Sequence, residues 1–198
     1  VGGRAGEARR LEQAHLVLML PAPGALDIDY FPLRLFVEAL GGGMSSRLFQ
    51  EAREKRGLAY AIDAYSDTYS DVGVLGVYAG CAARDTAALA EVCAAEIRAL
   101  ADAIAPDELA RAKAQLKAHL FMARESLIAR AEQAAGQILL YGRLFTAPEI
   151  AREIDAVTAA DMARLGARLI ASGRCVDAVL GPKVALAAGP AFEQAMFA

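Results

Sequence analysis

The chain has 198 residues, a formal net charge of −3 and 56% hydrophobic residues. This length fits one large domain or two small ones, and it can bury a core without disulfide or metal support. The near balance of charge argues against a nucleic-acid-binding surface or an acidic tail. The bulky apolar run at residues 16–20 ends at Pro21, far short of the ~18–20 residues of a membrane span, which argues against an integral membrane protein.

The two ends differ in composition from the middle of the chain. Residues 1–11 are rich in Gly and charge, which predicts a linker remnant, and residue 1 is Val rather than Met, as in a piece of a longer protein. Residues 183–198 are rich in Ala and Gly and are predicted to be a flexible tail. Residues 12–182 are predicted to form one domain.

Three cysteines occur in apolar surroundings and without a CxxC pair: Cys81, Cys93 and Cys175. We therefore expect reduced, buried thiols in a reducing compartment. This favours the cytoplasm, with the periplasm as the alternative because the start of the parent protein is missing.

Four segments have the pattern of strands: residues 14–20, 60–65, 72–81 and 174–181. The alternation in 60–65 predicts that Tyr60, Ile62 and Ala64 share one face, with Ala61, Asp63 and Tyr65 on the other. The polar run at 66–71 predicts a turn, so that the two middle segments form an antiparallel hairpin.

Helical periodicity predicts helices over 29–40, about 45–55, 85–100, from 106 onward and 128–142, followed by two short helices. Ser45 or Ser46 is expected to cap the second helix, and Gly57 to end it. The short helices begin with the capping boxes Thr146–Glu149 and Thr158–Asp161. Because strands cluster early and one returns at the end, the predicted fold class is α+β: an antiparallel or mixed sheet with helices packed on one face.

The residues needed for common catalytic centres are scarce. His15 and His119 are the only histidines and lie in neither HExxH nor HxxEH, so a zinc site built by this chain alone is not expected. There is no GxSxG motif. The glycines 41–43 precede a helix and could direct N–H groups to an anion, but no P-loop Lys follows, which favours a helix-to-helix turn over nucleotide binding.

A string of motifs in the same region resembles a known family. Residues 41–48 (GGGMSSRL) and 53–60 (REKRGLAY) carry the resemblance, supported by 14–23, 110–120, 130–143 and 149–162. The sequence resembles the pitrilysin-like zinc peptidases, which include insulin-degrading enzyme, mitochondrial processing peptidase and bacterial members. Over about residues 12–182 it is similar to their C-terminal half, which binds no zinc.

The resemblance implies a specific pair of functional residues. In this family two similar α+β halves face each other around a closed chamber, and the first half binds zinc through HxxEH and a distant glutamate. The second half contributes an Arg and a Tyr, which by motif match are Arg53 and Tyr60, with Arg56 as the competing arginine. Such side chains can orient a peptide and stabilise negative charge on its carbonyl oxygen.

The glycines acquire a second interpretation from the same resemblance. In the processing-peptidase branch a longer glycine-rich loop engages substrate, so Gly41, Gly42 and Gly43 are candidate substrate-binding residues. A hinge or close-packing role is the alternative.

The resemblance further implies that the parent is a zinc metalloendopeptidase and that this half, with no cofactor of its own, is inactive alone. The implied partners are a zinc-binding N-terminal half or partner subunit and a peptide substrate, within a homodimer or heterodimer; nucleic acid and membrane are not expected. The alternative is a zinc-less, non-catalytic subunit or scaffold of the same family.

Overall fold

A computed structural model describes residues 3–198, and a single mixed sheet organises them. The sheet is five-stranded in the order β1-β5-β2-β4-β3. Strand β1 is parallel to β5, and every other neighbouring pair is antiparallel. The strands are β1 (Gly3–Ala8), β2 (Ala14–Ala22), β3 (Ala59–Thr68), β4 (Gly73–Cys81) and β5 (Val176–Gly181). The sheet confirms the α+β prediction.

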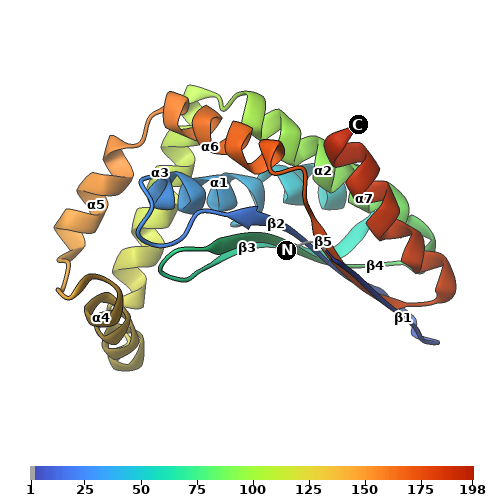
Figure 1. The fold of residues 1–198 in the computed structure, drawn as a ribbon, viewed down its shortest axis with the longest axis horizontal. Coiled ribbons are helices and arrows are strands. Elements are labelled where there is room, and N and C mark those ends of the chain that lie inside the picture. Colours follow the sequence, from blue (N-terminus) through green and yellow to red (C-terminus); the bar gives the residue numbers. More distant parts are fainter. Residues whose placement is uncertain (1–2) are drawn as a thin grey trace.

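Helices gather on one face of this sheet (Figure 1). Those that cover it are α1 (Tyr30–Gly41), α2 (Thr86–Asp102), α6 (Ala159–Ala171) and α7 (Ala188–Phe197). The remaining helical elements are η1 (Phe49–Lys55), η2 (Ala83–Asp85), α3 (Pro106–Ala123), α4 (Leu127–Tyr141), α5 (Ala147–Ala156) and η3 (Lys183–Ala187). Within residues 3–198, no helix combines the length and the apolar character that a membrane crossing needs.

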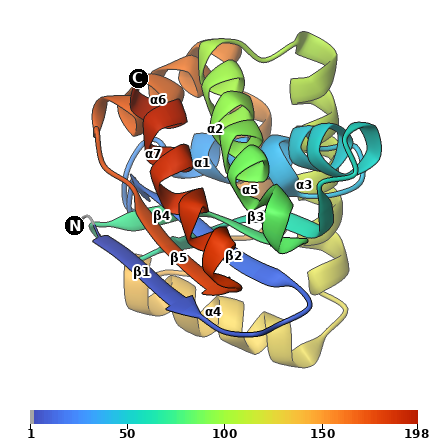
Figure 2. The same ribbon diagram turned by 90° about the vertical axis from the view of Figure 1, so that its right-hand side faces the viewer.

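The core lies between the sheet and its helices. Along β2 fully buried residues alternate with half-buried ones, and the buried set faces the helices. Phe36 of α1 and Phe192 of α7 are the largest fully buried side chains. Among residues 3–198, α4 lies on the opposite side of the sheet, toward one end of it, and the rest of that face has no helix over it (Figures 1 and 2).

Both ends of the described chain are ordered elements of the fold, which corrects the predicted linker and flexible tail. Residues 3–8 form β1, where Arg4 Nε donates to the buried Asp177 at 2.9 Å and Nη2 donates to Glu193 of α7 at 2.8 Å. Residues 183–197 form η3 and α7, and α7 packs on α2 and buries Phe192. Local composition was misleading because these contacts join residues far apart in the chain: Arg4 and Asp177 are 173 positions apart, and Arg98 of α2 and Ala195 of α7 are 97 positions apart. Residues 1–2 of the predicted linker lie outside the described range.

Two of the three cysteines are buried as predicted. Cys81 and Cys93 are buried, Cys175 is half-buried, and all three are free thiols. Burial raises the pKa of Cys81 to about 11 and that of Cys93 to about 12. Both buried thiols therefore stay protonated near neutral pH and are poor nucleophiles.

Both predicted capping boxes are present. The hydroxyl oxygens of Thr146 and Thr158 accept from the backbone N–H groups of Glu149 and Asp161, whose carboxylates accept in return from the threonine N–H groups. These contacts lower the pKa of Glu149 and of Asp161 to about 2.

We expect the free energy of unfolding of the Asp161→Asn variant to fall less between pH 7 and pH 2 than that of the parent sequence. Because the pKa of Asp161 is depressed in the folded state, its contribution is complete above pH 4 and disappears as the pH falls toward 2. The variant should therefore lose stability at pH 7 and approach the parent's stability near pH 2. Urea unfolding at both pH values measures this, and an equal deficit at both would contradict it.

Candidate functional site

The three candidate glycines occupy different environments at the end of α1. A Cβ atom on Gly41 would lie 2.4 Å from the backbone nitrogen of Ala64 in β3, so α1 and β3 approach too closely for any side chain. A Cβ on Gly42 would meet the carboxyl group of Glu38 at 2.6 Å, whereas one on Gly43 would have only Gln115 Nε2 nearby, at 3.4 Å. Close packing therefore accounts for Gly41, and Gly43 has room around it.

The residues after the glycines anchor the next helix, though not by the predicted serine cap. The Ser46 hydroxyl donates to the carbonyl oxygen of Gly43 at 2.6 Å, and η1 begins without a side-chain cap. Arg47 instead donates two hydrogen bonds of 2.7 Å to Glu108 and a third of 3.0 Å to the carbonyl of Ala103. This half-buried, bidentate salt bridge between Arg47 and Glu108 holds the start of η1 against the connection between α2 and α3. The sequence showed Arg47 in the family motif without indicating this partner.

Arg53 lies on a helix of unusual geometry. Residues Phe49–Lys55 form a π-helix, a rare conformation that occurs frequently at functional sites. The exposed guanidinium of Arg53 lies 4.8 Å from the centre of the Phe49 ring, within cation–π range. The helix ends as predicted at Gly57, whose φ of +62° reverses the chain and directs its N–H to the Arg53 carbonyl at 3.1 Å.

Tyr60 lies in a β-bulge at the start of β3, which corrects the predicted strand faces. Ala59 pairs with Cys81 of β4 and Ala61 pairs with Gly80, so Tyr60 is the extra residue in the ladder. As a result Ala59 and Ile62 are both buried, whereas Tyr60 and Ala61 are both exposed. Tyr60 thus does not share the face of Ile62, and the residue is 60% exposed.

The structure brings Arg53 and Tyr60 to one edge of the sheet. Strand β3 is the last strand on this side, and η1 packs directly against it. Within residues 3–198 neither Arg53 nor Arg56 forms a salt bridge. Both guanidiniums are exposed, so the competition between the two arginines stays open.

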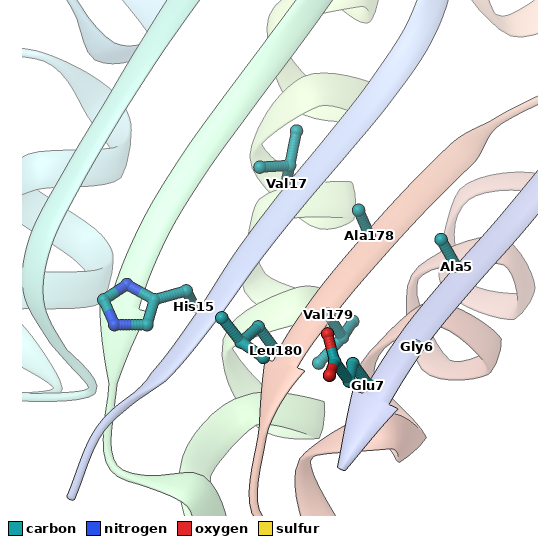
Figure 3. Close-up of a pocket in the computed structure, with 8 residues that line it drawn as sticks. All are labelled: Ala5, Gly6, Glu7, His15, Val17, Ala178, Val179 and Leu180. Atoms are coloured by element: carbon teal, nitrogen blue, oxygen red, sulfur yellow. The ribbon is translucent and has the colours of Figure 1, made fainter. Parts of the chain in front are cut away.

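A shallow groove of about 340 Å³ crosses the open face of the sheet (Figure 3). It is lined by β1, β2 and β5, chiefly through small or apolar residues: Ala5, Val17, Ala178 and Leu180. His15 and Glu7 add polar groups, and His15 Nδ1 lies 2.9 Å from the hydroxyl of Tyr78. The sequence did not point to this groove, because its residues come from strands far apart in the chain.

The strand registers relate the groove to the Tyr60 edge. Ala61 pairs with Gly80, Gly80 with His15, and His15 with Leu180, so these residues form one row across the sheet. Adjacent strands lie about 4.8 Å apart, which places Ala61 about 10 Å from His15. The groove and the edge that carries Tyr60 are therefore joined by one row of residues across the sheet.

The described part of the chain has no arrangement suited to a metal. Across residues 3–198, no group of three or more His, Cys, Asp or Glu side chains could hold a metal ion. His15 is engaged with Tyr78, and His119 lies 3.5 Å from a carboxylate oxygen of Glu38 on the helix-covered side. The candidate residues Arg53 and Tyr60 carry a guanidinium and a phenol, and both groups can donate hydrogen bonds.

This fold has counterparts among known proteins. Residues 4–116 match the family model described as the Peptidase M16 inactive domain. Since the match includes more than half of the chain, the protein belongs to this family. The resemblance noted in the sequence is thereby confirmed.

Individual relatives match over more of the chain than the family model does. An uncharacterized zinc protease of Rickettsia bellii is 33% identical over 183 residues, covering 92% of this chain and 44% of the relative. One from Streptomyces coelicolor is 35% identical over 175 residues, covering 88% of this chain and 38% of the relative. The chain therefore spans less than half the length of these relatives.

Solved structures show the same fold. A chain of complex III2 from Candida albicans superposes with a TM-score of 0.88 at 22% identity, covering all of this chain and 50% of that one. The peptidase M16 inactive domain from Pseudomonas fluorescens superposes with a TM-score of 0.78 at 21% identity. The match covers 93% of this chain and 44% of that one.

Proposed function

We propose that this chain is the zinc-free half of a zinc-dependent endopeptidase, and that it closes the peptide chamber and supplies Arg53 and Tyr60 to the reaction. The observation that carries the proposal is the backbone under these two residues. Arg53 lies on a π-helix and Tyr60 on a β-bulge, seven positions apart and joined by a turn at Gly57. Irregular backbone of both kinds is enriched near functional sites, where it redirects side chains.

The chemistry of the pair fits peptide hydrolysis. Zinc, held by the other half of the parent, would polarise the scissile bond and supply the attacking water. Arg53 would attract the peptide carbonyl oxygen by charge, and Tyr60 would donate its phenol O–H to the same oxygen as negative charge develops there. Two donors on the ends of firmly anchored elements need little reorganisation during the reaction.

The open sheet suits an extended peptide. The outer edge of β3 has no neighbouring strand in the sheet, so its free backbone N–H and C=O groups can pair with a peptide. The groove over β1, β2 and β5 can take an apolar side chain. Gly43, which has room around it, is the glycine best placed to approach a substrate.

Reconstitution of the parent from two separate chains tests the proposal. We expect neither this chain nor the remaining half alone to hydrolyse an unfolded peptide, and the mixture to do so. Metal analysis should find zinc on the remaining half and none in stoichiometric amount on this chain.

Stoichiometric zinc on this chain would contradict the proposal. So would a mixture that contains both halves but binds no zinc and cuts no peptide. The second outcome would favour the zinc-less scaffold instead.

A further inference from the structure

Helix α4 has its apolar side turned to solvent. Four of its large apolar residues are exposed, with Leu127 at 79%, Ile128 at 71%, Ile138 at 50% and Leu139 at 85%, whereas Leu140 is half-buried. No residue of the helix is buried. The less exposed side includes Gln133 and Gln137. A surface helix normally has its large apolar residues against the core and its polar residues in solvent.

The apolar stripe that leads into α4 also extends past the core. Along α3 the residues Leu109 and Leu116 are buried, but the stripe then continues to the exposed Phe121 and Met122 at the end of the helix. Leu144, just after α4, is exposed as well. We call the exposed apolar residues of this region the α4 face: Phe121, Met122, Leu127, Ile128, Ile138, Leu139 and Leu144.

The α4 face occupies a defined place in the molecule. Figures 1 and 2 both show α4 on the side of the sheet opposite to α1, α2, α6 and α7. The helix is held there at one end, because the Tyr141 hydroxyl donates to the carbonyl oxygen of Ala25 at 2.8 Å. A body that covered α4 would therefore also lie over or beside the open face of the sheet.

We propose that the α4 face binds the remaining half of the parent polypeptide. The inference rests on the proposed function, since its partner is the half that closes the chamber with this one. The related chains carry at least as much sequence again beyond the matched part, which spans 38–50% of their length. An apolar face with this many large exposed residues marks an interaction site rather than free surface.

Hydrogen exchange of α4 tests this inference. In the parent protein we expect the amides of residues 127–141 to exchange at least about tenfold more slowly than in the 198-residue chain, because contact with the other half suppresses local opening. Leu139→Glu should abolish that extra protection in the parent. It should leave the thermal midpoint of the 198-residue chain unchanged, because Leu139 is exposed there.

Val184→Glu is the matched control, since Val184 is exposed and lies on η3, outside the α4 face. Equal exchange of α4 in the parent and in the 198-residue chain would overturn the inference. A dimer of the 198-residue chain that Leu139→Glu dissociates would also overturn it, in favour of a second copy. Because hydrogen exchange is measured here and hydrolysis in the reconstitution experiment, failure of this inference and failure of the proposed function are distinguishable.

Discussion

If the parent is the proposed endopeptidase, replacing Tyr60 by Phe in it should lower kcat for peptide hydrolysis by about 10²–10³-fold, the usual effect of losing one oxyanion donor. The substitution removes only the hydroxyl. The ring of Tyr60 is mostly exposed and the bulge is formed by backbone pairing, so folding should not change. KM should change little, because a donor that acts in the transition state contributes little to ground-state binding.

Tyr69→Phe is the matched control. Tyr69 is also an exposed tyrosine, 70% accessible, and it lies in the turn between β3 and β4. This variant should keep full activity, and both variants should keep the parent's zinc content. Full activity in Tyr60→Phe would remove Tyr60 from the mechanism.

Gly41→Ala should lower the free energy of unfolding by about 1–3 kcal/mol, the range for forcing an extra group into a packed core. The added Cβ would lie 2.4 Å from the backbone of Ala64, and neither α1 nor β3 can move without disturbing the core between them. In a chain of this size each kcal/mol corresponds to a fall in Tm of about 2–4 °C. Urea unfolding with an unchanged m-value measures the loss.

Gly43→Ala separates packing from substrate binding. Its Cβ would meet only Gln115 Nε2, at an ordinary contact distance, so stability should stay within about 0.5 kcal/mol of the parent's. If Gly41→Ala instead keeps its stability but abolishes hydrolysis in the parent, Gly41 contacts substrate and its role is not packing.

Local sequence patterns were sufficient for much of this fold. The capping boxes at Thr146 and Thr158 were predictable, because their partners are three residues away. The helix end at Gly57 was predictable for the same reason, since a left-handed residue there favours Gly. The hairpin of β3 and β4 followed from alternation and a polar turn, and the family motifs identified the C-terminal half.

Long-range pairing decided what the local patterns could not. Strand β1 exists because it pairs with β5 and because Arg4 meets the buried Asp177, two partners at the other end of the chain. Helix α7 is ordered because Phe192 fills a space against α2. The Gly-rich and Ala-rich composition of the two chain ends did not indicate that β1 pairs with β5 or that α7 packs on α2.

By itself, therefore, the sequence determined the α+β class from the order of its predicted elements and the family from local motifs. The family resemblance in turn implied Arg53 and Tyr60 as candidates. Only the tertiary structure decided which face of its strand Tyr60 occupies and on what kind of helix Arg53 lies. The extra residue at Tyr60 is visible only against the register of β4, and it reverses the face that simple alternation predicts. Helix α4 was likewise predicted as a segment, but whether its apolar side faces the core depends on where the rest of the chain packs.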